Sequence, residues 1–137
     1  MTVVHIYTDG GSRGNPGPAA SAFMALVKSD GKERILRKMG RRIGRATNNQ
    51  AEYRAMIMAL EWALSRGFKD LVMHSDSELM VKQIRGEYAV RSPRVKDLHR
   101  RVMELLKATR FDIKHHRREE RHISVCDSLV NKALDGS

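Results

Sequence analysis

The sequence predicts an α/β fold in which helices pack on both faces of a five-stranded mixed sheet. Three strand-like segments follow one another before the first helical pattern, and two further strands then alternate with helices. A run of strands favours antiparallel pairing, whereas strands that alternate with helices favour parallel pairing. The size agrees, because 137 residues of which 41% are hydrophobic suffice for one domain with a buried core, spanning residues 1–137.

The first three strands are predicted by their composition and by the turns between them. Residues 3–8 are rich in β-branched and aromatic side chains, which favours a strand that ends at Asp9. Glycines and prolines crowd the next nine residues and indicate a loop. Residues 19–28 and 33–43 are expected to pair as an antiparallel hairpin, with Gly31 taking a positive φ in the turn between them.

The first helix has clear signals at both ends. Thr47 and Gln50 have the spacing of a capping box, and Gly67 is a typical stop after a helix that runs to about Arg66. Its small and apolar side chains repeat at helical spacing and predict one buried stripe, made of Ala51, Ala55, Met58, Ala59 and Trp62.

The remaining elements are shorter. In chain order they are a strand over residues 70–74, a helix from 77 to about 85, a helix over 94–108, a strand over 111–114 and a last helix. Ser75 or Ser77 is expected to cap the first of these helices, and Gly86 to end it. Ser124 is expected to cap the last helix, in which Cys126 packs as a buried residue.

The charge distribution indicates an anionic partner. The chain has 26 Lys and Arg against 16 Asp and Glu, a net charge of +10, and the cations concentrate in residues 28–45 and 91–121. An excess of this size favours nucleic acid, with a well-solvated basic surface as the alternative. A single cysteine excludes an internal disulfide, and no membrane span or signal peptide is evident, so we expect a cytoplasmic protein.

Four carboxylates occupy places that bring them together. Asp9 and Asp76 each follow a strand, and parallel neighbouring strands present their ends at the same sheet edge. Glu52 lies in the first turns of the capped helix and Asp127 in the first turn of the last helix. Each alone has an ordinary explanation as a turn former or as a charge at a helix N-terminus. Together they would repel one another unless divalent cations lay between them, which predicts a Mg²⁺-dependent phosphodiesterase.

The four motifs that hold these carboxylates resemble the signature blocks of type 1 ribonucleases H, in the same order and over essentially the whole chain. They are residues 7–17, 47–53, 74–77 and 126–133. The resemblance implies the ribonuclease H-like fold and hydrolysis of the RNA strand of an RNA–DNA hybrid to 5′-phosphate and 3′-hydroxyl ends. It also implies two Mg²⁺ ions, with Mn²⁺ as a substitute, held by Asp9, Glu52, Asp76 and Asp127.

The resemblance also suggests which residues bind the substrate. In the family, certain positions of these motifs contact the minor groove of the hybrid. The residues that resemble them here are Gly11, Ser12, Asn15, Asn48 and Asn49. Thr47 resembles a residue of a phosphate pocket. Short polar groups and backbone N–H groups suit this task, because the 2′-hydroxyl distinguishes RNA from DNA in a wide minor groove.

The chain departs from the family pattern in two places. It resembles a short form without the basic handle after the second helix, and we expect no separate N-terminal hybrid-binding domain. The family places a mobile basic residue before the last carboxylate, but residues 115–122 are longer than usual here. Arg118 is the first candidate for that residue and His116 the second. The alternative interpretation is that the histidines of this segment only end a strand and have no catalytic role.

Two alternative functions fit the same sequence. A non-catalytic nucleic-acid-binding module on the same fold is one, and a related nuclease that also cuts double-stranded RNA is another. The complete carboxylate set favours the nuclease, because four acids beside phosphate oppose simple binding. No obligate protein partner is evident in the sequence.

Overall fold

The computed structural model describes residues 2–136. Its elements are β1 (Val3–Ser12), β2 (Gly17–Ser29), β3 (Lys32–Ala46), α1 (Asn48–Ser65), β4 (Asp70–Ser75), α2 (Glu78–Ile84), α3 (Pro93–Leu106), β5 (Arg110–His115) and α4 (Arg121–Leu134). None of the helices within residues 2–136 is both long and apolar enough to cross a membrane.

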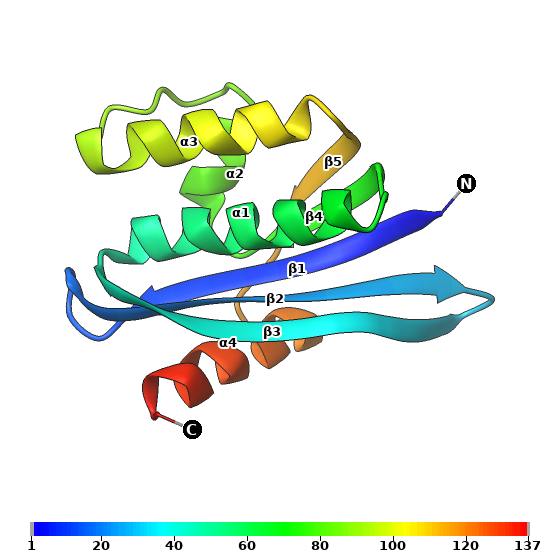
Figure 1. Cartoon of the computed structure of the whole chain (residues 1–137), viewed down its shortest axis with the longest axis horizontal. Helices are drawn as coiled ribbons and strands as arrows, with labels where there is room; N and C mark the ends of the chain where they lie inside the picture. Colours follow the sequence, from blue (N-terminus) through cyan, green and yellow to red (C-terminus); the bar gives the residue numbers. More distant parts are fainter. Residues whose placement is uncertain (1, 137) are drawn as a thin grey trace.

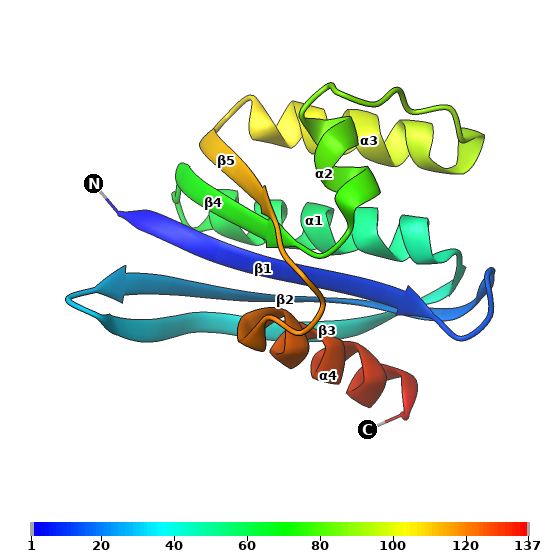
Figure 2. The ribbon, with the colours of Figure 1, turned by 180° about the vertical axis from the view of Figure 1, so that it is seen from behind.

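The strands form one mixed sheet in the order β3-β2-β1-β4-β5. β1 pairs antiparallel with β2 and parallel with β4, β2 pairs antiparallel with β3, and β4 pairs parallel with β5. α1, α2 and α3 lie on one side of the sheet and α4 on the other (Figures 1 and 2). The predicted fold class, a five-stranded mixed sheet with helices on both faces, is confirmed.

Each face of the sheet has its own core. On the α1 side, Ile6 of β1 and Phe23 of β2 pack with Met56 and Leu60 of α1. On the α4 side, Tyr7 of β1 and Met24 of β2 belong to a smaller cluster with Ile123, Cys126 and Val130 of α4. Successive strand residues thus serve opposite cores, as the pleat of a strand requires. The expected packing of Cys126 is confirmed, since it is fully buried.

The predicted turns and caps are largely confirmed. Thr47 and Gln50 form the capping box of α1, and Gly67, after the helix, has a φ of 78°. Gly31 has a φ of 73° in the β2–β3 turn, and Ser77 caps α2. In the predicted stripe of α1 the three alanines are buried, whereas Met58 and Trp62 are half-buried at its margin.

β1 is longer than predicted, which changes the position of Asp9. β1 continues to Ser12 because it stays paired with β2, through Asp9 with Ala22 and on to Ser12 with Ala19. Its parallel pairing with β4 ends at Tyr7 and His74. Asp9 therefore does not end the strand, but it does lie just past the last pair with β4.

The prediction for the start of the last helix was wrong. α4 begins at Arg121, and Glu120 is its N-cap, accepting hydrogen bonds from the backbone N–H groups of His122 and Ile123. Ser124 is an exposed residue inside the helix. The earlier start buries Ile123 in the core, and it moves Asp127 from the first turn into the second.

The connection from α2 to α3 matches the short form. Only residues 85–92 separate the two helices, and they include no further helix. The basic handle expected to be missing has no counterpart there.

Candidate active site

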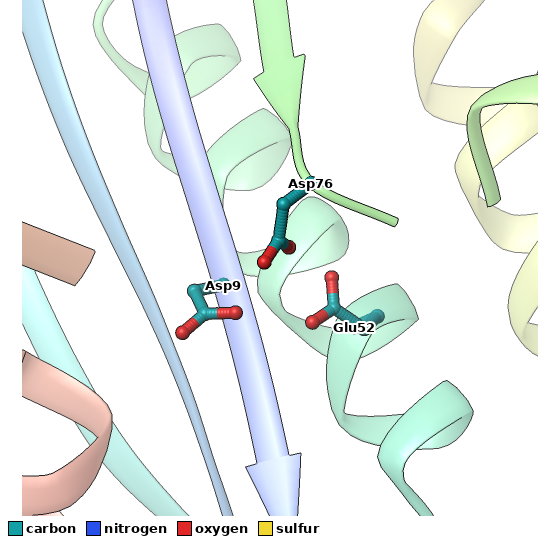
Figure 3. Close-up of side chains that lie close together, drawn as sticks. All are labelled: Asp9, Glu52 and Asp76. Atoms are coloured by element: carbon teal, nitrogen blue, oxygen red, sulfur yellow. The ribbon is translucent and has the colours of Figure 1, made fainter. Parts of the chain in front are cut away.

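Three of the four predicted carboxylates converge at the end of the β1–β4 pair. Asp9 comes from β1, Glu52 from α1 and Asp76 from the residue after β4, and their carboxyl groups face one another (Figure 3). Each offers an oxygen, and these oxygens lie within 4.8 Å of one another. Asp9 and Glu52 are only 5% and 8% exposed, whereas Asp76 is half-buried.

A close approach of α1 to β1 brings Glu52 to this place. A Cβ atom at Gly10 would lie 2.3 Å from the backbone carbon of Ala51, so only glycine allows the helix to pack at this distance. The Gly10 N–H donates to Glu52 Oε1 at 3.0 Å, and the Ser21 hydroxyl donates to the Ala51 carbonyl at 2.7 Å. The sequence predicts only a loop at Gly10, and this contact was not predicted.

The surroundings of the three carboxylates favour their neutral forms in the absence of a cation. Burial, followed by the charge of Asp76, raises the pKa of Asp9 to about 7. Burial and the charge of Asp9 raise the pKa of Glu52 well above its ordinary value. Burial also raises the pKa of Asp76, although the positive charge of Arg118 partly opposes this. A divalent cation would reverse this preference, because it stabilises ionised carboxylates.

The unsatisfied bonding capacity of Glu52 fits a metal site. Its Oε2 atom is buried and has no hydrogen-bond partner among the described residues. A buried oxygen without a partner costs about 1–3 kcal/mol, more when it is charged, and a coordinated ion would remove that cost. Carboxylate oxygens are the ligands that Mg²⁺ and Mn²⁺ prefer. The donor set therefore suits a hard divalent cation.

The fourth carboxylate, Asp127, lies outside this buried cluster. Its side chain is 41% exposed, and its Oδ1 atom lies 3.9 Å from Nη2 of Arg118. Asn131, one turn further along α4, donates to its Oδ2 at 3.4 Å. Asp127 is nevertheless close enough for its charge to raise the pKa values of Asp9 and Asp76. The structure thus groups Asp9, Glu52 and Asp76 together and places Asp127 apart from them.

The predicted substrate-binding residues form a hydrogen-bonded rim beside the acids. The backbone N–H of Ser12 donates to Oδ1 of Asn48 at 2.9 Å, and that of Asn48 donates to Oδ1 of Asn15 at 2.9 Å. Gly11 precedes Ser12 in β1, and the Thr47 side chain is occupied as the cap of α1.

Asn49 lines the carboxylate pocket itself. This open pocket, of about 320 Å³, is lined by Asp9, Gly10, Asn48, Asn49, Glu52, Asp76, Ser77 and Arg118. It combines three of the predicted acids with polar side chains, and Arg118 brings a positive charge to the same opening. Every substrate-binding residue predicted from the sequence lies in this pocket or on the rim beside it.

A row of histidines that was not predicted from the sequence lies next to the site. His74 of β4 is buried, and its two ring nitrogens lie 3.0 Å from His5 Nδ1 and 2.6 Å from His116 Nε2. His74 also stacks on Tyr7 at 4.1 Å. His116, the second candidate for a catalytic residue, is thus engaged with His74. The row could have been inferred only from the pairing of Tyr7 with His74 across β1 and β4, and the sequence alone does not give that register.

His122 joins α4 to the edge of the sheet. Its ring nitrogens lie 2.7 Å from Glu120 Oε2 and 2.9 Å from Glu33 Oε1, and its ring stacks on Tyr7 at 4.3 Å. Glu33 belongs to β3, so this contact fixes the start of the helix that carries Asp127. Neither acid had been singled out from the sequence.

The comparisons with known proteins agree on one family. A family model described as reverse transcriptase-like matches residues 8–133. The chain is 47% identical over 135 residues to ribonuclease HI of Halobacterium salinarum, which covers 96% of this chain and 64% of that protein. The crystal structure of ribonuclease H1 from the same archaeon has a TM-score of 0.90 and 42% identity, with 98% of this chain and 99% of that chain covered.

A second solved structure includes a nucleic acid. The crystal structure of LC11-RNase H1 in complex with an RNA/DNA hybrid has a TM-score of 0.86 and 34% identity, and 97% of each chain is covered. The chain spans less than two thirds of the first curated relatives, at 64% of the Halobacterium protein and 36% of a Mycobacterium bovis protein.

Proposed function

The chain belongs to the ribonuclease H family, and we propose that it is a metal-dependent endonuclease that hydrolyses the RNA strand of RNA–DNA hybrids. The observation that carries this proposal is the buried cluster of Asp9, Glu52 and Asp76, in which Glu52 keeps an oxygen without a partner. A net charge of +10 around an acidic pocket supports a polyanionic substrate. The LC11 relative, solved with a hybrid, supports the substrate class.

Asp9, Glu52 and Asp76 would hold the metal, with Asp127 completing the set from α4. Two Mg²⁺ ions, or Mn²⁺ in their place, would supply the positive charge that activates a water for attack on the RNA phosphate and stabilises the leaving oxygen. The products would carry 5′-phosphate and 3′-hydroxyl ends. The Gly10 N–H would keep Glu52 oriented, since it already donates to one of its oxygens.

The rim residues would present the hybrid to the acids. Asn15, Asn48 and Asn49, with the backbone at Gly11 and Ser12, offer short donors and acceptors that suit a wide minor groove and its 2′-hydroxyls. Thr47 would add a phosphate contact. Arg118 lines the pocket and would face the negative charge that develops on the phosphate, which an arginine can stabilise but not protonate near neutral pH.

A substrate panel tests this function. Labelled RNA–DNA hybrid, double-stranded RNA, double-stranded DNA and single strands are incubated with the protein, with and without Mg²⁺, and the ends of the products are identified. We expect cutting of the hybrid alone, only with Mg²⁺, to 5′-phosphate and 3′-hydroxyl ends. Binding of hybrid without cutting would instead identify a binding module, and preferred cutting of double-stranded RNA would reassign the substrate. A cytoplasmic location and the absence of an obligate protein partner stay predictions.

A further inference from the structure

The edge strand β3 carries an unusual series of positive charges. Between Lys32 and Ala46 it has seven cationic side chains and one acid, and all seven cationic residues are exposed. They are Lys32, Arg34, Arg37, Lys38, Arg41, Arg42 and Arg45. None of the seven forms an ion pair within residues 2–136. The one acid, Glu33, is already bound by His122 and Arg121.

Three of these arginines stand on the same side of the strand. Arg34, Arg37 and Arg41 pair in register with Val27, Ala25 and Ser21 of β2. Those partners face α1: Ala25 and Val27 pack in the core on that side, and the Ser21 hydroxyl bonds to Ala51 of α1. Because paired residues of antiparallel strands share a face, the three arginines belong to the α1 side. We call this set the β3 strip.

A groove extends the strip toward α1. It has a volume of about 320 Å³ and is lined by Arg41, Arg42, Ile43, Arg54, Ile57, Met58 and Glu61. Arg54 is exposed on α1, two residues after Glu52, and has no ion pair among the described residues. Glu61, the acid of this groove, is bound by Arg101. The groove therefore presents arginines whose charges are not neutralised from within the protein.

We propose that the β3 strip and this groove are a second nucleic-acid-binding surface, which holds the sugar–phosphate backbone of the duplex beyond the active site. The inference rests on the proposed function, because it assumes that the duplex in the pocket is the one that reaches the strip. Arginine suits the task, since its planar fork matches a phosphate with two hydrogen bonds. An ordinary solvated surface would intersperse acids among these cations.

The position of the strip determines how long a duplex bound in the pocket must be to contact it. β3 ends at Ala46, directly before Thr47 and the pocket residues Asn48 and Asn49. At about 3.3 Å per residue, the strand from Arg34 to this end is about 40 Å long. One strand of a duplex carries a phosphate about every 3.4 Å along the helix axis, so about twelve phosphates would separate the pocket from the far end of the strip. A hybrid that only fills the pocket would not reach it.

The test compares two triple variants on two hybrid lengths. Arg34→Gln, Arg37→Gln and Arg41→Gln together neutralise the strip. Arg66→Gln, Lys69→Gln and Lys107→Gln together make the same charge change near the C-terminal ends of α1 and α3, where the chain enters β4 and β5. Binding of labelled hybrids of about 8 and about 30 base pairs is measured by fluorescence anisotropy without divalent metal at several salt concentrations. Cutting is measured in parallel with Mg²⁺.

We expect the strip variant to bind the long hybrid about tenfold more weakly, with an unchanged kcat. The slope of the logarithm of its binding constant against the logarithm of the salt concentration should become shallower by the equivalent of about two phosphate contacts. Its binding of the short hybrid, and all binding by the control variant, should stay within about twofold of the unmodified chain. Equal binding by both variants on the long hybrid would overturn the proposal. So would an equal loss on both lengths, or self-association of the strip variant without loss of binding, which would assign the arginines to protecting a sheet edge.

The readouts separate this inference from the function on which it rests. If the unmodified chain cuts hybrid but the strip variant binds like the control, only the inference fails. If the unmodified chain binds hybrid without cutting it, the proposed function fails, and the anisotropy data still decide the role of the strip.

Discussion

The four predicted acids fall into two regions that hold their charges in different ways. Asp9 and Glu52 are buried, and Glu52 is fixed by the contact between β1 and α1 at Gly10. Asp127 is 41% exposed and is paired at 3.9 Å with Arg118, itself 76% exposed. Backbone packing sets the first region, whereas a solvent-screened ion pair, typically worth about 0–1 kcal/mol, sets the second. We therefore expect the metal requirement to depend on the buried region and the rate of turnover to be adjusted by the exposed one.

The largest expected effect comes from the buried region. Asp76→Asn keeps the shape of the side chain but removes a charge from the cluster of Asp9, Glu52 and Asp76. We expect kcat on the hybrid to fall about a thousandfold, a barrier change of about 4 kcal/mol, while hybrid binding persists or tightens because a repulsive charge is gone. Single-turnover cutting and anisotropy on the same hybrid measure the two quantities. Near-normal turnover in this variant would remove the cluster from the mechanism.

A smaller effect is expected from the exposed region. Arg118→Ala should lower kcat about ten- to a hundredfold, a change of about 1.4–2.7 kcal/mol, with Arg117→Ala as a matched control on the same loop. Because an arginine does not titrate near neutral pH, the remaining activity should keep the pH profile of the unmodified chain. His116 contacts His74 rather than the pocket acids, so the pH profile of His116→Ala should match that of the unmodified chain. An inflection that disappears only in His116→Ala would make the histidine the active group instead.

The smallest expected effect concerns stability without metal. The pKa of Asp9 is about 7 in the folded chain, above its ordinary unfolded value. The folded state therefore holds a proton that the unfolded state has lost. Its contribution to stability is fully present below about pH 4 and is lost as the pH rises through 7. In EDTA, the Tm should fall between pH 5 and pH 8, and Asp9→Asn should flatten that slope.

The controls for this measurement are an exposed acid and the metal. Asp30→Asn keeps a residue that tolerates the observed φ of 53° in the turn, and it should leave the slope unchanged. Mg²⁺ added at pH 8 should raise the Tm of the unmodified chain more than that of Asp9→Asn. A Tm that rises with pH in EDTA would contradict the effect of burial on Asp9.

The same two regions show how far the sequence could be interpreted. The capping box at Thr47 and the parallel pairing of β1 with β4 placed Asp9, Glu52 and Asp76 together, because local signals and simple sheet geometry determine these positions. The start of α4 was wrong by about one turn. The sequence offers a carboxylate cap at Glu120 as well as a serine cap at Ser124, and the structure has the Glu120 cap, with Ile123 in the core.

Apart from the Glu120 cap, the contacts that sequence reasoning missed are long-range. His122 meets Glu33 across 89 residues of sequence, and His74 meets His116 across 42. A single histidine has no spacing pattern that announces such a partner. The cations of β3 were visible as a basic segment, but their shared side of the strand and their lack of ion pairs required the register with β2.

The contact at Gly10 has a consequence for transplanting this chemistry to other scaffolds. The separation of Asp9 and Glu52 is set by how near a helix backbone can come to a strand backbone, and a Cβ at residue 10 would lie 2.3 Å from Ala51. A designer who copies the acidic side chains onto another sheet and helix, with an ordinary residue at this crossing, would obtain the right carboxylates at the wrong spacing. The minimal unit to graft is therefore the acids together with the glycine between their backbones.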